Sequence, residues 1–107
     1  MQVINWPLEE SFFTQDILLG DRPFIMSATW NERDETWVIS LSTTNNEILV
    51  TNRRIIINTD ILDGVHSENK PQGYLMVVPM TPIVIPITQS NMGIDILLIF
   101  VGFDEVL

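Results

Sequence analysis

The sequence predicts an all-β fold, a small antiparallel β-sandwich or partly open β-barrel of about seven strands. Ile, Val and Thr supply thirty-three of the 107 residues, whereas alanine occurs once. Side chains branched at Cβ are restricted at χ1 and fit a pleated surface better than a helix. Turn-forming residues recur about every ten positions, which indicates short strands. The length fits a single β domain over residues 1–107.

The first half of the chain alternates apolar and polar residues at the two-residue period of half-buried strands. Residues 1–11 mix Trp and Pro with acids, and we expect an N-terminal arm there. The 12–19 segment fits a first strand with its odd-numbered residues on one face. The 24–30 and 37–42 segments predict two strands, and the charged residues 31–35 connect them as a β-hairpin.

The second half contains more continuous apolar runs. Residues 47–58 predict one or two strands with a break near their middle, and 60–72 a loop with at most one helical turn. The 74–78 segment is apolar throughout, so we expect a strand covered on both faces. Three prolines in 79–86 exclude a central strand, because proline cannot donate to a β-ladder. Residues 94–102 predict the last strand, in the middle of the core.

Charge and cysteine content exclude several classes of function. Fourteen acidic residues against five basic ones give a net charge of −9, which argues against binding to nucleic acid phosphates. There is no cysteine, so disulfides, thiolate zinc sites and cysteine nucleophiles are excluded. We expect no cofactor.

The sequence offers little for a membrane. Its longest near-apolar run, residues 94–103, includes Asp95, and a membrane-spanning helix needs about twenty residues. Lys70 is the single lysine, so we expect no binding to an anionic membrane surface. Acids within the first ten residues and the lack of a basic start argue against a signal peptide.

The 60–68 stretch holds the residues closest to a catalytic or metal-binding pattern. His66 adjoins a serine and Glu68, but neighbours in one loop rarely meet the geometry of a catalytic triad. Asp60, Asp63 and Glu68 are possible calcium ligands whose spacing does not match the EF-hand loop. A solvated acidic loop is the favoured interpretation, and we expect the protein not to be an enzyme.

Arg53 and Arg54 are consecutive in a strand and should point to opposite faces. One interpretation is an inward or interface arginine paired with an acid. The other is a charge that protects an edge strand from aggregation.

Tryptophan and proline supply the candidate contact residues. Trp37 is expected in the core, whereas Trp6 lies in the expected arm and is a better candidate for an interface. The apolar 80–87 run is either a covered edge or a strand donated to a neighbouring subunit. The candidate subunit contacts are Trp6, Pro82, Ile83, Ile85 and Pro86. An alternative function is a carbohydrate- or small-ligand-binding module in which exposed Trp stacks on the ligand.

The order of four motifs resembles a known family. A Trp-Asn-x-Arg-x-x-x-Trp hairpin (Trp30, Asn31, Arg33, Trp37) is followed by an Arg-Ile-Ile-Ile strand running into Asp-Ile-Leu. A Pro-x-Gly-x-Leu entry to a strand (Pro71, Gly73, Leu75) and a terminal Leu-Ile-Phe-Val strand complete the series. Over residues 12–102 this order is similar to the small baseplate plug proteins of contractile-tailed bacteriophages.

The resemblance implies a structural virion protein at the central hub of the tail baseplate, made in the host bacterial cytoplasm and without catalysis. Its implied partners are copies of itself and tail hub, tube or wedge proteins. The family carries glycines near Asn52 and Asn58, and asparagine tolerates the left-handed conformation that glycine adopts. The family also carries basic residues in the last strand, where this chain has Asp95, so charged contacts do not transfer.

Overall fold

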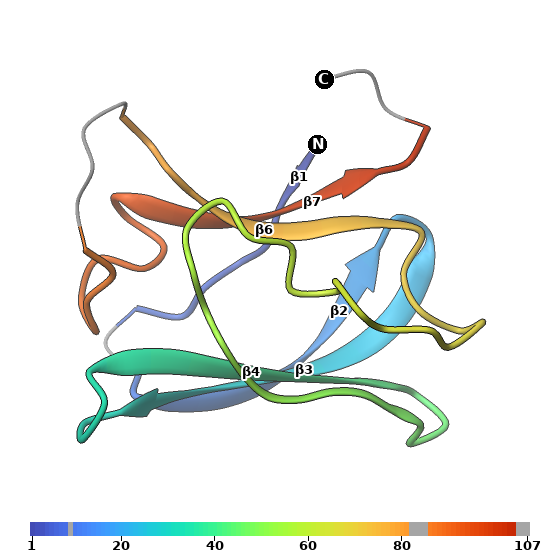
Figure 1. The fold of residues 1–107 in the computed structure, drawn as a ribbon, viewed down its shortest axis with the longest axis horizontal. Coiled ribbons are helices and arrows are strands. Elements are labelled where there is room, and N and C mark those ends of the chain that lie inside the picture. The colour runs from blue at the N-terminus through green and yellow to red at the C-terminus, as the bar shows by residue number, and fades with distance from the viewer. Residues whose placement is uncertain (9, 82–85, 105–107) are drawn as a thin grey trace.

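The computed structural model describes residues 1–8, 10–81 and 86–104, and it confirms a small all-β sandwich of seven strands. The strands are β1 (Gln2–Val3), β2 (Phe12–Leu19), β3 (Arg22–Asn31), β4 (Thr36–Thr43), β5 (Ile48–Arg54), β6 (Gly73–Pro79) and β7 (Ile96–Gly102). One antiparallel sheet has the order β2-β3-β4-β5 and the other β1-β7-β6. The two sheets form two layers with the core between them (Figure 1).

The predicted hairpin is confirmed. β3 and β4 pair from Phe24 to Asn31, and Trp30 lies directly opposite Trp37. The even-numbered residues of β3 point to the core, with Phe24, Met26 and Ala28 at most 1% exposed. The alternation of side chains therefore fixes which face of this sheet is buried.

β5 contains the irregularity that the sequence indicated. The register between β4 and β5 shifts on both sides of Leu41. Asn52 has a φ of 46° and, beyond the strand, Asn58 has a φ of 63°. Asparagine tolerates this left-handed conformation better than most residues other than glycine do.

β7 occupies the centre of its sheet, between β1 and β6, as expected. The expectation for β6 was wrong, because this strand is covered on one face. Leu75 and Val77 of β6 are fully buried, whereas Tyr74, on the opposite face of the same strand, is 42% exposed. A three-stranded sheet places one face on the core, and the described residues place no layer over the other.

The N-terminal segment is part of the sandwich instead of an arm. Gln2 pairs with Phe100 of β7, and the amide of Ile4 donates to the carbonyl of Leu98 at 2.9 Å. The segment then runs from one sheet to the other (Figure 1). Ile4 and Trp6 are 4% and 5% exposed, because they fill the space between the layers.

The 60–72 loop folds back on β5 and β6 through turns. Asp60 Oδ1 accepts hydrogen bonds from the amides of Leu62 and Leu75, both at 3.0 Å. Arg53 Nη1 donates to the carbonyls of Ile61 and Asp63 at 2.8 and 2.6 Å. The inward arginine therefore bonds to backbone carbonyls.

Candidate functional site

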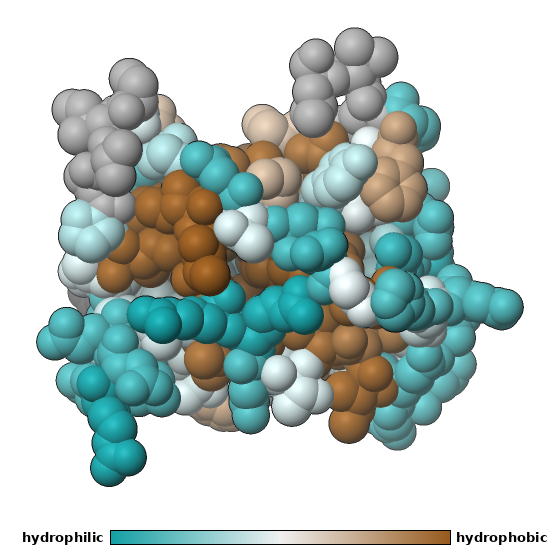
Figure 2. Space-filling view, in the orientation of Figure 1, coloured by the Kyte–Doolittle hydropathy of each residue, from teal (hydrophilic) through white to brown (hydrophobic). Residues whose placement is uncertain are grey.

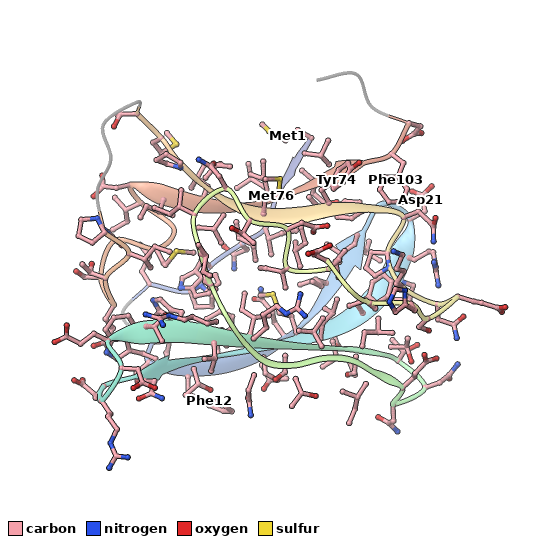
Figure 3. All side chains as sticks on the ribbon, in the orientation of Figure 1. Met1, Phe12, Asp21, Tyr74, Met76 and Phe103 are labelled. Atoms are coloured by element: carbon pink, nitrogen blue, oxygen red, sulfur yellow. The ribbon has the colours of Figure 1, made fainter. Side chains whose placement is uncertain are left out.

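The outer surface of the β1-β7-β6 sheet is apolar, and we call it the apolar face. Paired residues in adjacent strands share one face of a sheet, so the register defines its members. They are Val3 of β1, Tyr74, Met76 and Val78 of β6, and Leu97, Ile99 and Val101 of β7. Met1, Met80 and Phe103 extend it at the strand ends, and Figure 3 shows Met1, Tyr74, Met76 and Phe103 on the side away from the other sheet.

The centre of the apolar face is packed and its margin is exposed. Ile99 and Val101 are 7% and 3% exposed although they point outward, because the neighbouring strands flank them. Around them Met1, Val3 and Phe103 are each more than half exposed. Tyr74 and Phe103 meet edge to face with ring centroids 5.1 Å apart. Brown and tan residues along the upper margin of Figure 2 mark this surface seen edge-on.

The outer face of the other sheet is different in kind. A line of polar side chains crosses its four strands at Thr14, Ser27, Ser40 and Asn52. Thr14 Oγ1 and Ser27 Oγ are 3.2 Å apart, and the amide of Asn52 donates to Ser40 Oγ at 2.9 Å. This outer surface is nevertheless mixed, because Phe12 on one side of the polar line and Leu18 and Ile48 on the other are each more than half exposed.

Acidic residues flank the apolar face. In the described part of the chain, β1, β6 and β7 carry no charged side chain. Asp95 precedes β7 and Asp104 follows it, and both are exposed. Asp21 lines a cavity of about 520 Å³ together with Asp104. Arg22 of β3 lines the same cavity. The other basic residues are Arg33 in the hairpin turn, Arg53 and Arg54 in β5, and Lys70 in the 60–72 loop.

The hairpin motif from the sequence forms a local structural unit. Asn31 Oδ1 accepts the amides of Arg33 and Asp34 at 3.0 and 3.2 Å, which closes the turn. The rings of Trp30 and Trp37 lie 5.7 Å apart below it. Arg33 itself is exposed at the tip.

Trp6 corrects the prediction of a subunit contact. Its ring meets Phe13 and Trp37 edge to face, at 5.0 and 4.9 Å between centroids. At 5% and 0% exposure, Trp6 and Trp37 are unavailable to a partner protein or to a stacking sugar. Trp30 is half-buried on the same cluster.

The other candidate contacts belong to the 80–87 run. Pro82, Ile83 and Ile85 lie outside the described residues. Pro86 is exposed and lines a groove of about 500 Å³ with Ile56 and other residues of the chain. A contact through this run stays a prediction.

The residues weighed for catalysis or metal binding are dispersed. Asp60 Oδ1 accepts hydrogen bonds from two backbone amides. His66 and Glu68 are exposed. Across the described ranges, no group of three His, Cys, Asp or Glu residues is placed to hold a metal ion. The same ranges contain no helix long and apolar enough to cross a membrane.

The sequence did not predict the apolar face. β6 and β7 are apolar at consecutive positions, a pattern that predicts burial on both faces of a strand. No local signal in the sequence distinguishes the two cases, because a continuous apolar run looks the same whether a second layer covers its outer face or not.

Fold and face together define a small β-sandwich with an exposed apolar sheet surface, an arrangement typical of proteins that bind other proteins. The family model described as cyanophage baseplate Pam3 plug gp18 matches residues 1–104. The chain therefore belongs to this family of phage baseplate plug proteins, which confirms the resemblance seen in the motifs. It is a structural component of the virion tail baseplate and interacts with other baseplate proteins. The search of curated proteins found no match.

Proposed function

We propose that this protein is a central hub or plug component of a contractile phage tail, and that it acts by protein–protein contact without catalysis. It would be made in the host bacterial cytoplasm and would join hub, tube or wedge proteins, or copies of itself, during assembly. The observation that carries the proposal is the apolar face on a member of the plug family.

The face supports a contact role because its exposure is unfavourable in water. Burying apolar surface contributes about 25 cal/mol per Å². Met1, Val3 and Tyr74 retain 72%, 52% and 42% of their accessible surface, so a neighbour that covers them gains this free energy. The outer face of the other sheet also exposes Phe12, Leu18 and Ile48, but the polar line from Thr14 to Asn52 separates Phe12 from the other two and interrupts the apolar surface.

The absence of catalysis is supported by what the polar side chains already do. Asp60 orders the 60–72 loop through two backbone amides, and Asn31 closes the hairpin turn. These groups act on the backbone of their own chain, as structural residues do.

Cryo-electron microscopy of the parent phage tests the location. We expect density for this chain at the centre of the baseplate, and a tail without it would overturn the proposal.

Complementation of a phage lacking the gene tests the face. We expect the Val3→Asp/Met76→Asp chain to fold but to restore few or no plaques, because charges cannot be buried against an apolar partner. The matched control, Thr29→Asp/Ser42→Asp, places two charges on the outer face of the other sheet, opposite the exposed Phe12 and Ile48, and should restore plaques. Wild-type plaque numbers with the first pair would contradict a contact through this face.

A further inference from the structure

We propose that the apolar face binds a different protein, whose contact surface is apolar with Lys or Arg at its margin, and that it does not bind a second copy of this chain. This inference rests on the contact role proposed above and specifies the chemistry of the partner.

Charge is the first argument. The flanks of β7 are Asp95 and Asp104, and the strands of the face contribute no compensating charge in the described residues. A second copy stacked on this face would set acids against acids, and like charges across an interface oppose association. Each copy also carries a net charge of −9. A margin of Lys or Arg removes the repulsion and complements the acids.

The three strands of the apolar face cover less area than a standard interface, so a partner also contacts the acids at the strand ends. Three strands with a longest member of seven residues span roughly 350 Å² in projection, from ordinary strand spacings. A standard interface buries about 800 Å² on each partner. The partner must therefore reach beyond the strands, over the positions of Asp95 and Asp104.

The layout of the acids constrains the partner further. Asp95 and Asp104 lie at opposite ends of β7, so their backbones are about 25–30 Å apart along an extended chain. The matching surface has basic side chains at both ends of an apolar strip. At one of these ends Asp21 and Arg22 line a cavity with Asp104, and since their charges are opposite, Asp104 sets the net negative charge there.

Sedimentation equilibrium of the purified chain tests the exclusion of a second copy. We expect a monomer at about 100 µM in dilute salt, where electrostatic repulsion is strongest, and also in physiological salt, where the acids at the two ends of β7 still meet at short range. A wild-type dimer that Val3→Asp/Met76→Asp converts to a monomer would overturn the inference.

Photo-crosslinking in assembled baseplates tests the partner. With Tyr74→p-benzoylphenylalanine we expect crosslinks to another baseplate protein, at a peptide containing Lys or Arg. The control Ser40→p-benzoylphenylalanine, in the polar line of the other sheet, should give few. Crosslinks from position 74 to a second copy would overturn the inference.

Charge reversal tests whether Asp95 and Asp104 contact basic side chains of the partner. Asp95→Lys/Asp104→Lys should lower the crosslink yield from position 74 about tenfold, because the contacts of residues 95 and 104 with basic side chains of the partner become repulsive. Glu32→Lys/Glu68→Lys makes the same change in net charge away from the face and should leave the yield within about twofold. Equal yields in both variants would contradict a basic partner. If cryo-electron microscopy places this chain outside the tail, the proposed function is overturned. The inference about the apolar face is tested separately, because sedimentation equilibrium still measures whether two copies associate.

Discussion

Arg53 and Arg54 are consecutive in β5, yet they have different environments. Arg53 is half-buried and its Nη1 donates to two carbonyls of the 60–72 loop, whereas Arg54 is exposed. Removing Arg53 leaves the part-buried carbonyl of Ile61 and the exposed carbonyl of Asp63 without a charged donor, so we expect Arg53→Ala to lower the free energy of unfolding by about 1–2 kcal/mol. Arg54→Ala should change it by less than about 0.5 kcal/mol. Urea denaturation compares the two, and equal effects would contradict the role given to Arg53.

Glu47 joins the turn after β4 to the 60–72 loop. Its carboxylate accepts hydrogen bonds from Ser67 Oγ and from Asn69 Nδ2, the latter at 2.7 Å. The bond from Ser67, followed by that from Asn69, holds the pKa of the Glu47 carboxyl below its ordinary value of 4.5. A pKa lowered by folding contributes stability that is complete above the unfolded value and disappears as the pH falls through the folded one.

The pH dependence of Glu47→Gln follows from this sign. We expect this variant to have a lower Tm than the wild type at pH 7, and the difference to shrink as the pH falls below 4.5. Glu32→Gln, at an exposed turn position, is the control and should leave Tm nearly unchanged. Circular dichroism melts across this pH range measure both. A Tm difference that grows in acid would show that the carboxylate of Glu47 does not stabilise the fold.

At the scale of elements, the Pro-x-Gly-x-Leu motif has a packing explanation. Pro71 and Leu75 are fully buried where the chain enters β6. A Cβ on Gly73 would lie 2.4 Å from the carbonyl oxygen of Val101 and 2.6 Å from Cζ of Phe100. The motif therefore records the close approach of β6 to β7.

We expect Gly73→Ala to lower the free energy of unfolding by about 3 kcal/mol or more, because backbone atoms of β7 must shift. Gly64→Ala has a different cause and a smaller effect. Gly64 has a φ of +84° with no atom within 4 Å of the added Cβ, so we expect about 1–2 kcal/mol from backbone strain alone. Chemical denaturation separates the two, and equal losses would contradict the steric explanation.

The N-terminal segment gives a second prediction for an element. Trp6 packs between the two sheets against Phe13 and Trp37, so we expect Trp6→Ala to cost about 3–5 kcal/mol. Leu8→Ala changes a side chain that is 54% exposed and should cost less than about 1 kcal/mol. Tryptophan fluorescence during urea unfolding measures both. Full stability of the Trp6 variant would restore the interpretation of this segment as an arm.

The sequence predicted those strands whose position and buried face depend on the pattern of neighbouring residues. Alternation identified the inward residues of β3 and β4, and continuous apolar character placed β7 at the centre of its sheet. The role of Trp6 was not predictable, because it depends on a pairing between β1 and the far end of the chain. The hydrogen bonds of Arg53 were not predictable either, because its acceptors are the backbone carbonyls of Ile61 and Asp63, and every residue has a carbonyl whatever its side chain.

At the scale of the whole molecule, two properties oppose each other. The mean hydropathy is +0.24, and part of that apolar character lies on the exposed face of β1-β7-β6. The net charge of −9 keeps copies apart, since a net charge far from zero favours solubility. The acids around the face thus limit self-association before assembly, while the face itself remains available to a partner.

This balance predicts how solubility depends on pH. The isoelectric point of the sequence is about 4.1, so repulsion between copies vanishes near that pH while the apolar face is unchanged. We expect the wild type to reach a sharp solubility minimum there, because the uncharged copies associate through exposed apolar side chains. Val3→Gln/Met76→Gln keeps the charge and reduces the apolar surface, so its solubility at the minimum should be higher. Thr29→Gln/Ser42→Gln, on the outer face of the other sheet, leaves the apolar face intact and should behave as the wild type does. Soluble protein after centrifugation measures the effect, with circular dichroism confirming that the chain is folded. Identical minima in all three proteins would mean that the apolar face does not drive association when the charge is removed.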